Sequence, residues 1–381
     1  MVNDRQATVV NRAGLRYNYK HKGMVAYRPE RGYLSCKPER HARTDVLLTC
    51  AGRRNYLVEF FRAALAGSGR VLAADARADA AALAEADAAF VTPDALDPHY
   101  PERLLELCAR EDVGLVVPLN DLELPVLARE RERFRAEGVQ VVVSSPEVID
   151  LCFDKLATAR KLAEWGFAAP ATFDELGAAL HALDTGRLLP PAVVKPRWGS
   201  GSIGVEFCPD RRELVLAHQL VSMRLGRTAL AASSAADPEH AVLVQEHVPG
   251  QEYGLDIVND LAGRTAAVFV KRKLAMRAGE TDRAETVADA DLEQLGHDLG
   301  TRLGHVGNLD CDLFVHRQGV TVMELNPRFG GGYPFTHAAG ANVPAALVAW
   351  WQGRAPEPGW LEARPGVVAA KCDRLAVHRS H

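Results

Sequence analysis

Residues 307–332 read GNLDCDLFVHRQGVTVMELNPRFGGG, and this stretch predicts two short strands joined by a turn. In a strand, alternate side chains share a face, so Asp310 and Asp312 point together, as do Glu324 and Asn326. If the two strands pair, up to three carboxylates and one amide meet at one end of the hairpin. Such a cluster needs protons or cations to neutralise it, and hard oxygen ligands beside a phosphate suit Mg²⁺. A solvated hairpin face is the alternative interpretation.

The residues after the cluster favour a binding site. Arg328 follows Asn326 by two positions, and three glycines occupy residues 330–332. A guanidinium group and bare backbone beside carboxylates form an arrangement suited to phosphate or carboxylate groups.

The first half of the chain alternates apolar strands with helical stretches. The strands are predicted at residues 45–50, 71–74, 114–119 and 139–144. Strands alternating with helices indicate a parallel sheet covered on both faces. Ligands of such sheets bind beyond the carboxyl ends of the strands, so Gly52, Arg53, Asn120 and Asp121 are expected near a crevice. Helix capping explains Asp121 equally well.

Lys195 stands near the end of an apolar strand and precedes GSGSIG, residues 199–204. The hexamer fits G-x-G-x-x-G, but residues 205–208 continue as a strand where a dinucleotide-binding fold needs a helix. The chain has no HRD or DFG motif of a protein kinase and no Gly-Lys dipeptide of a P-loop. We therefore predict a lid, in which backbone N–H groups fold over phosphates while the lysine supplies positive charge. A purely structural glycine-rich turn is the alternative.

Two further segments place polar groups at turns. Residues 245–252 read QEHVPGQE, and a strand end of this type exposes backbone groups that can read an adenine edge. Glu252 is placed to accept ribose hydroxyls, although a solvent-facing turn carboxylate explains it equally well. Residues 266–286 form a strand that enters a basic loop containing Arg277. A mobile basic loop suits an anionic intermediate, but alone it is an unremarkable surface loop.

Composition narrows the class of protein. A chain of 381 residues, 48% hydrophobic and 25% charged, is ordinary for a globular protein of two or three domains. No apolar run approaches the ~18 residues of a membrane span, and seven scattered cysteines without a CxxC pair indicate free thiols in a reducing cytoplasm. The net charge of -4 gives no reason to expect nucleic acid. Residues 1–43 carry a net charge of +7 and form a basic N-terminal extension to which no function is assigned.

A strand lysine, a glycine hairpin, QEHVPGQE, a basic loop and Asp…Glu-x-Asn-Pro-Arg occur in that order. With these motifs, residues 44–360 resemble the ATP-grasp superfamily, most of all ligases akin to the carbamoyl-phosphate synthase large subunit and the pyrrolysine-biosynthesis ligase PylC. The resemblance implies a mixed α/β and α+β architecture. Its expected parts are a Rossmann-like pre-ATP-grasp domain (44–152), an ATP-grasp lid (153–249) and a C-terminal subdomain with the metal site (250–381).

The resemblance also implies ATP and Mg²⁺ as cofactors and assigns residues to them. Lysines contact the phosphates, residues 246–248 form the adenine hinge and Glu252 holds the ribose. The implied nucleotide contacts are Lys155, Lys195, Gly199, Ser200, Gly201, Ser202, Gly204, Glu246, His247, Val248 and Glu252. The implied metal ligands are Asp310, Glu324 and Asn326, and the implied catalytic residues are Arg328, Arg277 and Lys195.

Details of the pattern favour one branch of the superfamily. The carbamoyl-phosphate synthase type has Gln where Asp310 stands, whereas many amino-acid ligases have Asp. The resemblance assigns no role to Asp312.

The resulting hypothesis is an amino-acid or peptide ligase that joins a small-molecule carboxylate to an amine through an acyl phosphate, with release of ADP and phosphate. Two alternatives remain open: an ATP-grasp kinase with a stable phosphorylated product, and a nucleotide-binding protein without catalysis. Fold analogy does not decide among them. A homodimer is the assembly expected for the family. The sequence does not identify either substrate.

Overall fold

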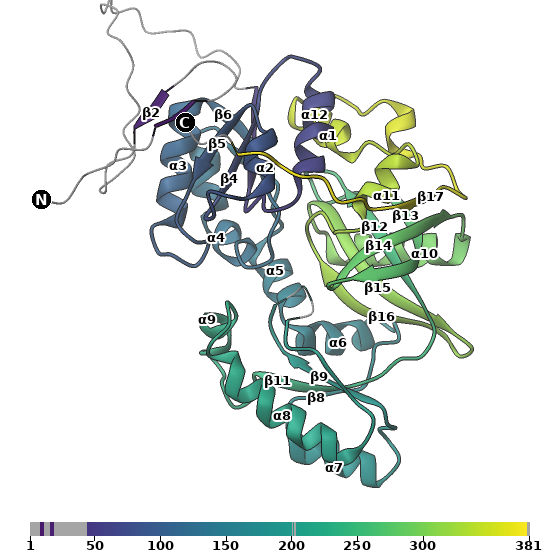
Figure 1. Ribbon diagram of the computed structural model, residues 1–381. Coiled ribbons are helices and arrows are strands. Elements are labelled where there is room, and N and C mark those ends of the chain that lie inside the picture. The colour runs from purple at the N-terminus through teal and green to yellow at the C-terminus, as the bar shows by residue number, and fades with distance from the viewer. Residues whose placement is uncertain (1–7, 11–15, 19–43, 200, 202, 379–381) are drawn as a thin grey trace, which may run out of the picture.

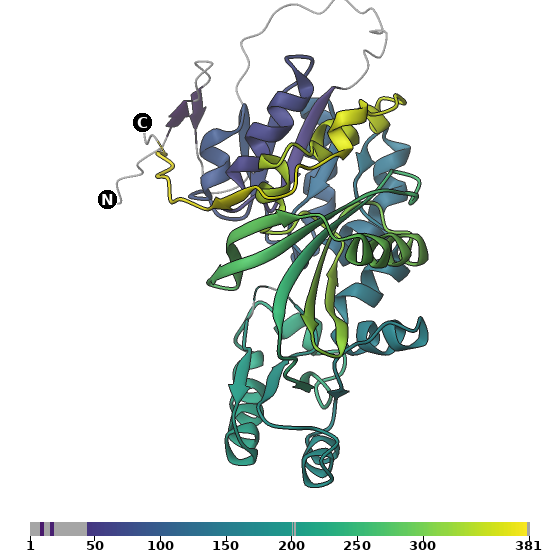
Figure 2. The same cartoon turned by 90° about the vertical axis from the view of Figure 1, so that its right-hand side faces the viewer.

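The computed structural model describes residues 8–10, 16–18, 44–199, 201 and 203–378. Three bodies follow one another along the chain: an N-terminal domain, a lid and a C-terminal domain (Figures 1 and 2). Before them, β1 (Thr8–Val10) pairs antiparallel with β2 (Arg16–Asn18). The rest of the predicted N-terminal extension lies outside the described residues.

The N-terminal domain is built on a five-stranded parallel sheet in the order β5-β4-β3-β6-β7. Its strands are β3 (Asp45–Thr49), β4 (Val71–Asp75), β5 (Ala88–Val91), β6 (Val113–Pro118) and the short β7 (Gln140–Val141). Its helices are α1 (Asn55–Leu65), α2 (Ala81–Glu85), α3 (Tyr100–Glu111), α4 (Leu124–Ala136) and α5 (Pro146–Phe153).

Both faces of this sheet are buried, as the alternating pattern predicted. Alternate residues of β3 enter two different cores: Val46 packs in the cluster that includes Phe61 of α1, and Leu47 packs in the cluster that includes Leu104 of α3. Because every residue of β3 is buried, the strand is continuously apolar apart from its ends.

The lid has a small core of its own, formed by residues such as Val194, Leu214 and Val244. Its antiparallel sheet has the order β10-β9-β11-β8. Its strands are β8 (Thr172–Phe173), β9 (Ala192–Pro196), β10 (Glu206–Cys208) and β11 (Val242–Glu246), and its helices are α7 (Leu176–Asp184), α8 (Arg211–Leu225) and α9 (Ala231–Ser234). The glycine-rich hexamer joins the paired strands β9 and β10, so the predicted glycine hairpin is confirmed.

Helix α6 (Lys155–Glu164) is capped by Asp154, whose side chain accepts hydrogen bonds from the amides of Leu156 and Ala157. Leu162 of this helix is buried in the core of the C-terminal domain. The helix that the sequence prediction grouped with the lid therefore packs with the C-terminal domain.

The C-terminal domain contains a six-stranded antiparallel sheet in the order β16-β15-β12-β13-β14-β17. Its strands are β12 (Gln251–Asn259), β13 (Thr265–Arg277), β14 (Glu280–Val287), β15 (Gly307–His316), β16 (Gly319–Asn326) and β17 (Val368–Ala370). Helix α10 (Ala290–Leu303) covers one face, while α11 (Tyr333–Ala338), α12 (Val343–Trp351) and the short 3-10 helix at Pro358–Leu361 follow the sheet. The predicted hairpin of residues 307–326 is present as β15 and β16, and α12 packs against α1 of the N-terminal domain (Figure 1).

Two general predictions can be compared with the described residues. All six described cysteines are free, as predicted. Within the described part of the chain, no helix has the length and apolarity needed to cross a membrane.

Candidate nucleotide and metal site

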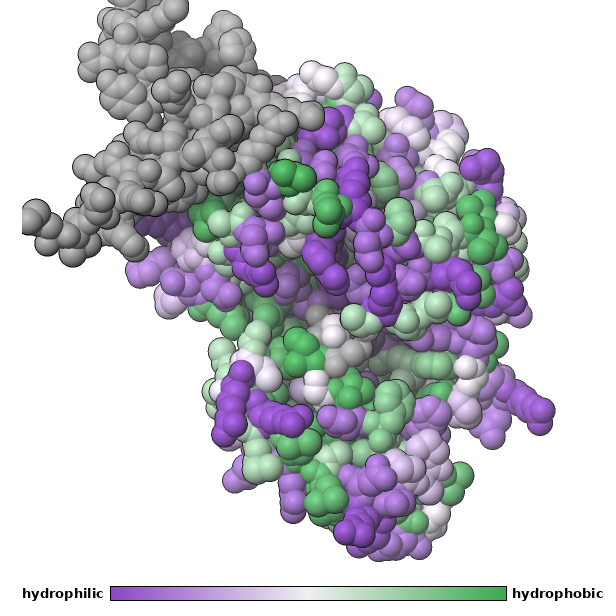
Figure 3. Space-filling model, in the orientation of Figure 1, coloured by the Kyte–Doolittle hydropathy of each residue, from purple (hydrophilic) through white to green (hydrophobic). Residues whose placement is uncertain are grey.

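A cavity of about 430 Å³ lies between the lid and the C-terminal sheet. Figure 3 shows a hollow at this position, with hydrophobic side chains along the side of the lid. Apolar side chains from both bodies line it, including Val193 and Ile203 from the lid and Phe314 and Met323 from the C-terminal domain. A cavity of this size with apolar walls and a few polar groups is typical of a small-molecule site.

The predicted adenine and ribose residues line one part of this cavity: Glu246, His247, Val248 and Glu252. The Glu246 carboxylate accepts a hydrogen bond from the amide of Ala171 at 3.1 Å, so this side chain also ties β11 to the chain entering the lid. Glu252 accepts a hydrogen bond from Nζ of Lys273 at 2.7 Å. The backbone after β11 and the Glu252 carboxylate therefore face the same space.

Two lysines lie at another part of the cavity. Lys195 is buried at the end of β9, and Lys155 reaches it from the first turn of α6. Burial lowers the pKa of Lys195 to about 8; the Glu324 carboxylate opposes this shift, and the positive charge of Lys155 adds to it. Two cations held this close indicate a site for a polyanion.

The glycine hairpin is held over this lysine pair. Nζ of Lys155 donates to the carbonyl of Gly199, and the Lys155 amide donates to the carbonyl of Arg197 at 3.1 Å. A side chain at Gly199 would collide with Leu230 at 2.4 Å, and φ there is +103°. Glycine is therefore required at this turn. Gly201 lines the cavity and Gly204 has φ of +68°, whereas the predicted contacts Ser200 and Ser202 lie outside the described residues.

The β15–β16 hairpin brings the predicted metal ligands together in a definite register. Asp312 lies opposite Glu324, and Asp310 lies opposite Asn326. The Asn326 amide donates to the Glu324 carboxylate at 3.1 Å. Asp312 and Glu324 line the cavity beside Lys155 and Lys195, so the acid to which the sequence assigned no role faces the lysines.

Crowding of the acids changes their proton affinities. Burial raises the pKa of Asp312 to about 7, with Lys273 opposing the shift and Asp310 and Glu324 adding to it. Burial also raises the pKa of Asp310 above its usual range. For Glu324, burial acts in the same direction, but the charges of Lys155 and Lys195 outweigh it and hold the pKa low.

These oxygen atoms fit a hard divalent cation that shares its coordination with a phosphate. Among the described residues, no group of three or more His, Cys, Asp or Glu side chains is arranged to hold a metal alone. Carboxylates and an amide oxygen are the ligands that Mg²⁺ prefers, and substrate phosphates usually supply the remainder. A cation bound at the Glu324 end would also relieve the repulsion between the neighbouring carboxylates.

Lys273 is a site residue that lies in the predicted basic segment, residues 266–286, but received no individual role there. Its buried Nζ donates to Asp312 at 2.6 Å and to Glu252 at 2.7 Å, so it links the acidic hairpin to the predicted ribose residue. Lys271 and Lys273 alternate on β13, and Lys271 pairs with buried Asp256 at 2.5 Å. Their spacing of two residues places both lysines on one face of the strand, and this was the signal that could have identified them.

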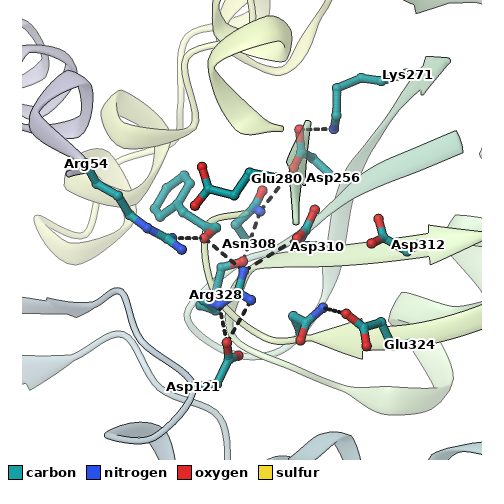
Figure 4. A network of polar contacts seen from close by, with 12 residues as sticks. Arg54, Asp121, Asp256, Lys271, Glu280, Asn308, Asp310, Asp312, Glu324 and Arg328 are labelled. Carbon is teal, nitrogen blue, oxygen red and sulfur yellow. Dashed lines mark hydrogen bonds and ion pairs between the residues drawn. The ribbon is translucent and has the colours of Figure 1, made fainter. Parts of the chain in front are cut away.

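Arg328 is buried between carboxylates of two domains. Its Nε and Nη2 donate to Asp121 of the N-terminal domain at 2.9 and 2.8 Å, and its Nη1 donates to Asp310 at 3.4 Å (Figure 4). The pKa of this guanidinium is raised: burial acts to lower it, but the two carboxylates outweigh that effect. Helix capping does not describe the role of Asp121, because its carboxylate binds Arg328.

Arg277, a predicted catalytic residue, does not lie with the other predicted catalytic residues, Lys195 and Arg328. Its half-exposed guanidinium pairs with Asp282 at 2.7 Å and with Asp373 at 2.8 Å on the surface. Its neighbours Met276 and Gly279 line the cavity, so this hairpin borders the site without the Arg277 side chain.

The predicted crevice residue Arg53 is exposed, whereas the adjacent Arg54 donates to the carbonyl of Phe329. His337 stacks on Phe60 of α1 with ring centroids 3.6 Å apart.

Comparisons with known proteins agree with this geometry. Residues 46–142 match the PylC-like N-terminal domain, and residues 238–373 match the family described as ATP-grasp in the biosynthetic pathway with Ter operon. Residues 46–142 are therefore similar to the PylC-like N-terminal domain and residues 238–373 to an ATP-grasp family, and the predicted fold and family resemblance are confirmed.

Among curated proteins, the chain is similar to an uncharacterised Sinorhizobium fredii protein, y4rH, with 33% identity over 49% of this chain and 38% of that protein. It is also similar to the carbamoyl phosphate synthase large chain of Rubrobacter xylanophilus, with 26% identity over 66% of this chain and 23% of that protein. The matches thus span well under half the length of these relatives.

Solved structures share the fold at low sequence identity. The biotin carboxylase domain of Hydrogenobacter thermophilus 2-oxoglutarate carboxylase, in complex with MgADP and bicarbonate, matches 86% of this chain and 74% of its own at a TM-score of 0.67 and 14% identity. The L-amino acid ligase from Bacillus licheniformis matches 80% of this chain and 73% of its own at a TM-score of 0.57 and 16% identity. ATP and Mg²⁺, the predicted cofactors, are the usual cofactors of ATP-grasp proteins.

Proposed function

We propose that the protein is an ATP-dependent carboxylate–amine ligase, of the amino-acid or peptide ligase type, that acts through an acyl phosphate. The observation that carries this proposal is the meeting of Lys155, Lys195, Asp312 and Glu324 at one end of a nucleotide-sized cavity. Cations for phosphates and oxygen ligands for a metal are thereby combined beside an apolar chamber of suitable size for a base.

Residues of the lid and the C-terminal domain would hold ATP and Mg²⁺. The strand end at 246–248 and Glu252 would take the adenosine, while Lys155, Lys195 and the glycine hairpin would take the phosphates. We propose Asp310, Glu324 and Asn326 as metal ligands, with Asp312 completing the acidic face opposite Glu324. When bound, Mg²⁺ supplies charge neutralisation to the phosphates during transfer.

In the first step, an oxygen of the substrate carboxylate attacks the γ-phosphorus, and the bond from that phosphorus to the bridging oxygen of ADP breaks. Lys195 offsets charge on the phosphates, and Arg328 holds the acyl phosphate. In the second step, the amine nitrogen attacks the acyl carbon, the bond from that carbon to the phosphate oxygen breaks, and the nitrogen loses a proton. The contribution of the chain is positioning and electrostatics, and closure of the lid excludes water.

Hydroxylamine trapping tests this function. Purified protein is incubated with MgATP, hydroxylamine and a panel of amino acids and other carboxylates. A coloured hydroxamate that depends on one carboxylate, with matching ADP and phosphate, supports the ligase and names its acid substrate. ADP formation with neither hydroxamate nor free phosphate would instead indicate the kinase, and would overturn the proposal.

A further inference from the structure

The parallel sheet of the N-terminal domain has its topological switch point between β3 and β6. From β3 the chain builds outward through β4 to β5, and from β6 it builds to β7 on the other side. In sheets of this kind, the crevice beyond the carboxyl ends of the two strands at the switch point is the usual place for a ligand. Here the residues that follow these strands include Arg54, after β3, and Asp121, after β6.

These two side chains contact a turn of the C-terminal domain. Asp121 accepts two charge-assisted hydrogen bonds from Arg328, at 2.9 and 2.8 Å. Arg54 donates to the carbonyl of the next residue, Phe329. Figure 4 shows Arg54 and Asp121 reaching Arg328 and its neighbour from the N-terminal domain. The switch-point crevice therefore holds a turn of the C-terminal domain.

The turn that carries Asp121 is itself held firmly. The amides of Leu119 and Asn120 donate to the buried Glu123 carboxylate at 2.8 and 3.0 Å, and the Tyr100 hydroxyl donates to the same carboxylate at 2.6 Å. Such a supported turn presents Asp121 in one position. The side chains of Asp121 and Arg328 are only 8% and 7% exposed, so water screens their attraction weakly.

The charges around Arg328 come from opposite sides. Asp121 binds Nε and Nη2, while Asp310 of the C-terminal domain lies 3.4 Å from Nη1. Asp121 makes the shorter contacts and the larger number of them, so it determines the plane of the guanidinium. Without its negative charge, Arg328 would be left with the Phe329 carbonyl at 3.2 Å and the Asp310 carboxylate at 3.4 Å, both on Nη1, and would turn toward them.

We propose that Asp121 is a positioning residue of the reaction: it orients Arg328, and it thereby makes phosphoryl transfer in the C-terminal domain depend on docking of the N-terminal domain. The functional half of this inference rests on the proposed ligase reaction. Asp121 does not line the cavity proposed for ATP, so we expect it to act on the transfer step and not on binding of the nucleotide.

Kinetics of Asp121→Asn test this role. The variant keeps the size of the side chain and removes its charge, so we expect kcat to fall by about 10–100-fold, as for other partners that orient a site residue. The KM for ATP should stay within about twofold of the wild-type value, whereas a merely structural role would lower the melting temperature and leave kcat per folded molecule unchanged. Asp121→Glu keeps the charge and should recover part of the loss.

Glu59→Gln is the matched control. It removes a different acid of the N-terminal domain that pairs across to the C-terminal segment, at 3.0 Å from Arg374, but it lies on the surface away from Arg328. We expect its kcat to equal that of the wild type. A kcat of Asp121→Asn within about twofold of the wild type would overturn the positioning role.

The Arg328 Nε–H resonance in ¹⁵N NMR separates this inference from the proposed function, because it needs no turnover. We assign the resonance by its loss in Arg328→Lys, and we expect slow solvent exchange in the wild type and fast exchange with a changed shift in Asp121→Asn. If Asp121→Asn does not fold, Asp121→Glu is measured in its place, and its Arg328 Nε–H resonance should have a changed chemical shift. An unchanged resonance would overturn the inference, whereas absence of carboxylate-dependent turnover in the wild type would overturn only the proposed function.

Discussion

Gly330→Ala is the substitution whose effect can be worked out most directly from the structure. A Cβ atom at this position would lie 2.1 Å from Cγ of Asp310 and 2.2 and 2.3 Å from its carboxylate oxygens. Ordinary contacts begin at 3.4 Å, so the carboxylate or the loop must move by about 1 Å. Asp310 cannot move freely, because it is largely buried and bound by Arg328.

This movement has two measurable consequences. Overpacking of a well-packed site reduces the free energy of unfolding by about 1–3 kcal/mol, and a misplacement of about 1 Å at a reacting centre can reduce the rate about 100-fold. We therefore expect a lower melting temperature together with a loss of ATP turnover of about 100-fold.

The assay is ADP release with MgATP and the carboxylate found by trapping, paired with thermal melting. Gly177→Ala is the control, because residue 177 is an exposed helix position with no atom within 4 Å of the added methyl group. Alanine there should leave turnover unchanged and slightly raise the melting temperature. If Gly330→Ala kept both wild-type turnover and wild-type melting, the contact between residue 330 and Asp310 would be refuted.

Three further predictions concern individual charges. Glu324→Gln should lower ATP turnover at least about 100-fold with little change in melting temperature, because glutamine keeps the hydrogen bond to Asn326 but removes the charge that a cation needs. Retention of most activity, at any Mg²⁺ concentration tested, would contradict the metal assignment. Affinity for MgATP should fall about tenfold between pH 8.5 and 9.5, because Lys195, with a pKa of about 8, loses its charge as the pH rises, whereas Asp312, with a pKa of about 7, is already ionised in this range. Calorimetry across this range, with Lys195→Met as the control that lacks the titrating amine, measures the fall, and a flat wild-type profile would refute the prediction. Arg277→Ala should leave kcat in the same ADP-release assay and the melting temperature close to the wild-type values, because the guanidinium pairs with Asp282 and Asp373 on the surface and does not line the cavity. A marked loss of kcat would restore the catalytic role that the sequence predicted for Arg277.

Several features of the site are legible in the sequence because they are local. The alternation in residues 307–326 predicted both strands and the shared face of Asp310 and Asp312, and β15 and β16 confirm it. The order of strand, glycine hairpin and strand placed Lys195 beside a lid, because a hairpin needs only its own residues to be recognised.

Other features depend on register and on side-chain partners far away in the chain. The alternation does not say which acid lies opposite Glu324; a register shift after Asp312 and the length of the turn decide that it is Asp312. Arg277 carries the expected charge in the expected loop, yet its guanidinium binds Asp282 and Asp373, because a long side chain on a hairpin can take either of two directions.

By itself, then, the sequence determined the strands, the lid hairpin, the family resemblance and the kinds of ligand the acids and lysines suit. Only the tertiary structure decided that Asp121 binds Arg328, 207 residues later in the chain, and that Lys273 joins Asp312 to Glu252. The physical reason is that periodicity and turn chemistry act between near neighbours in the chain. Pairing between buried charges, in contrast, is selected by the free energy of the whole packed structure, in which a buried charge must find a partner wherever the fold supplies one.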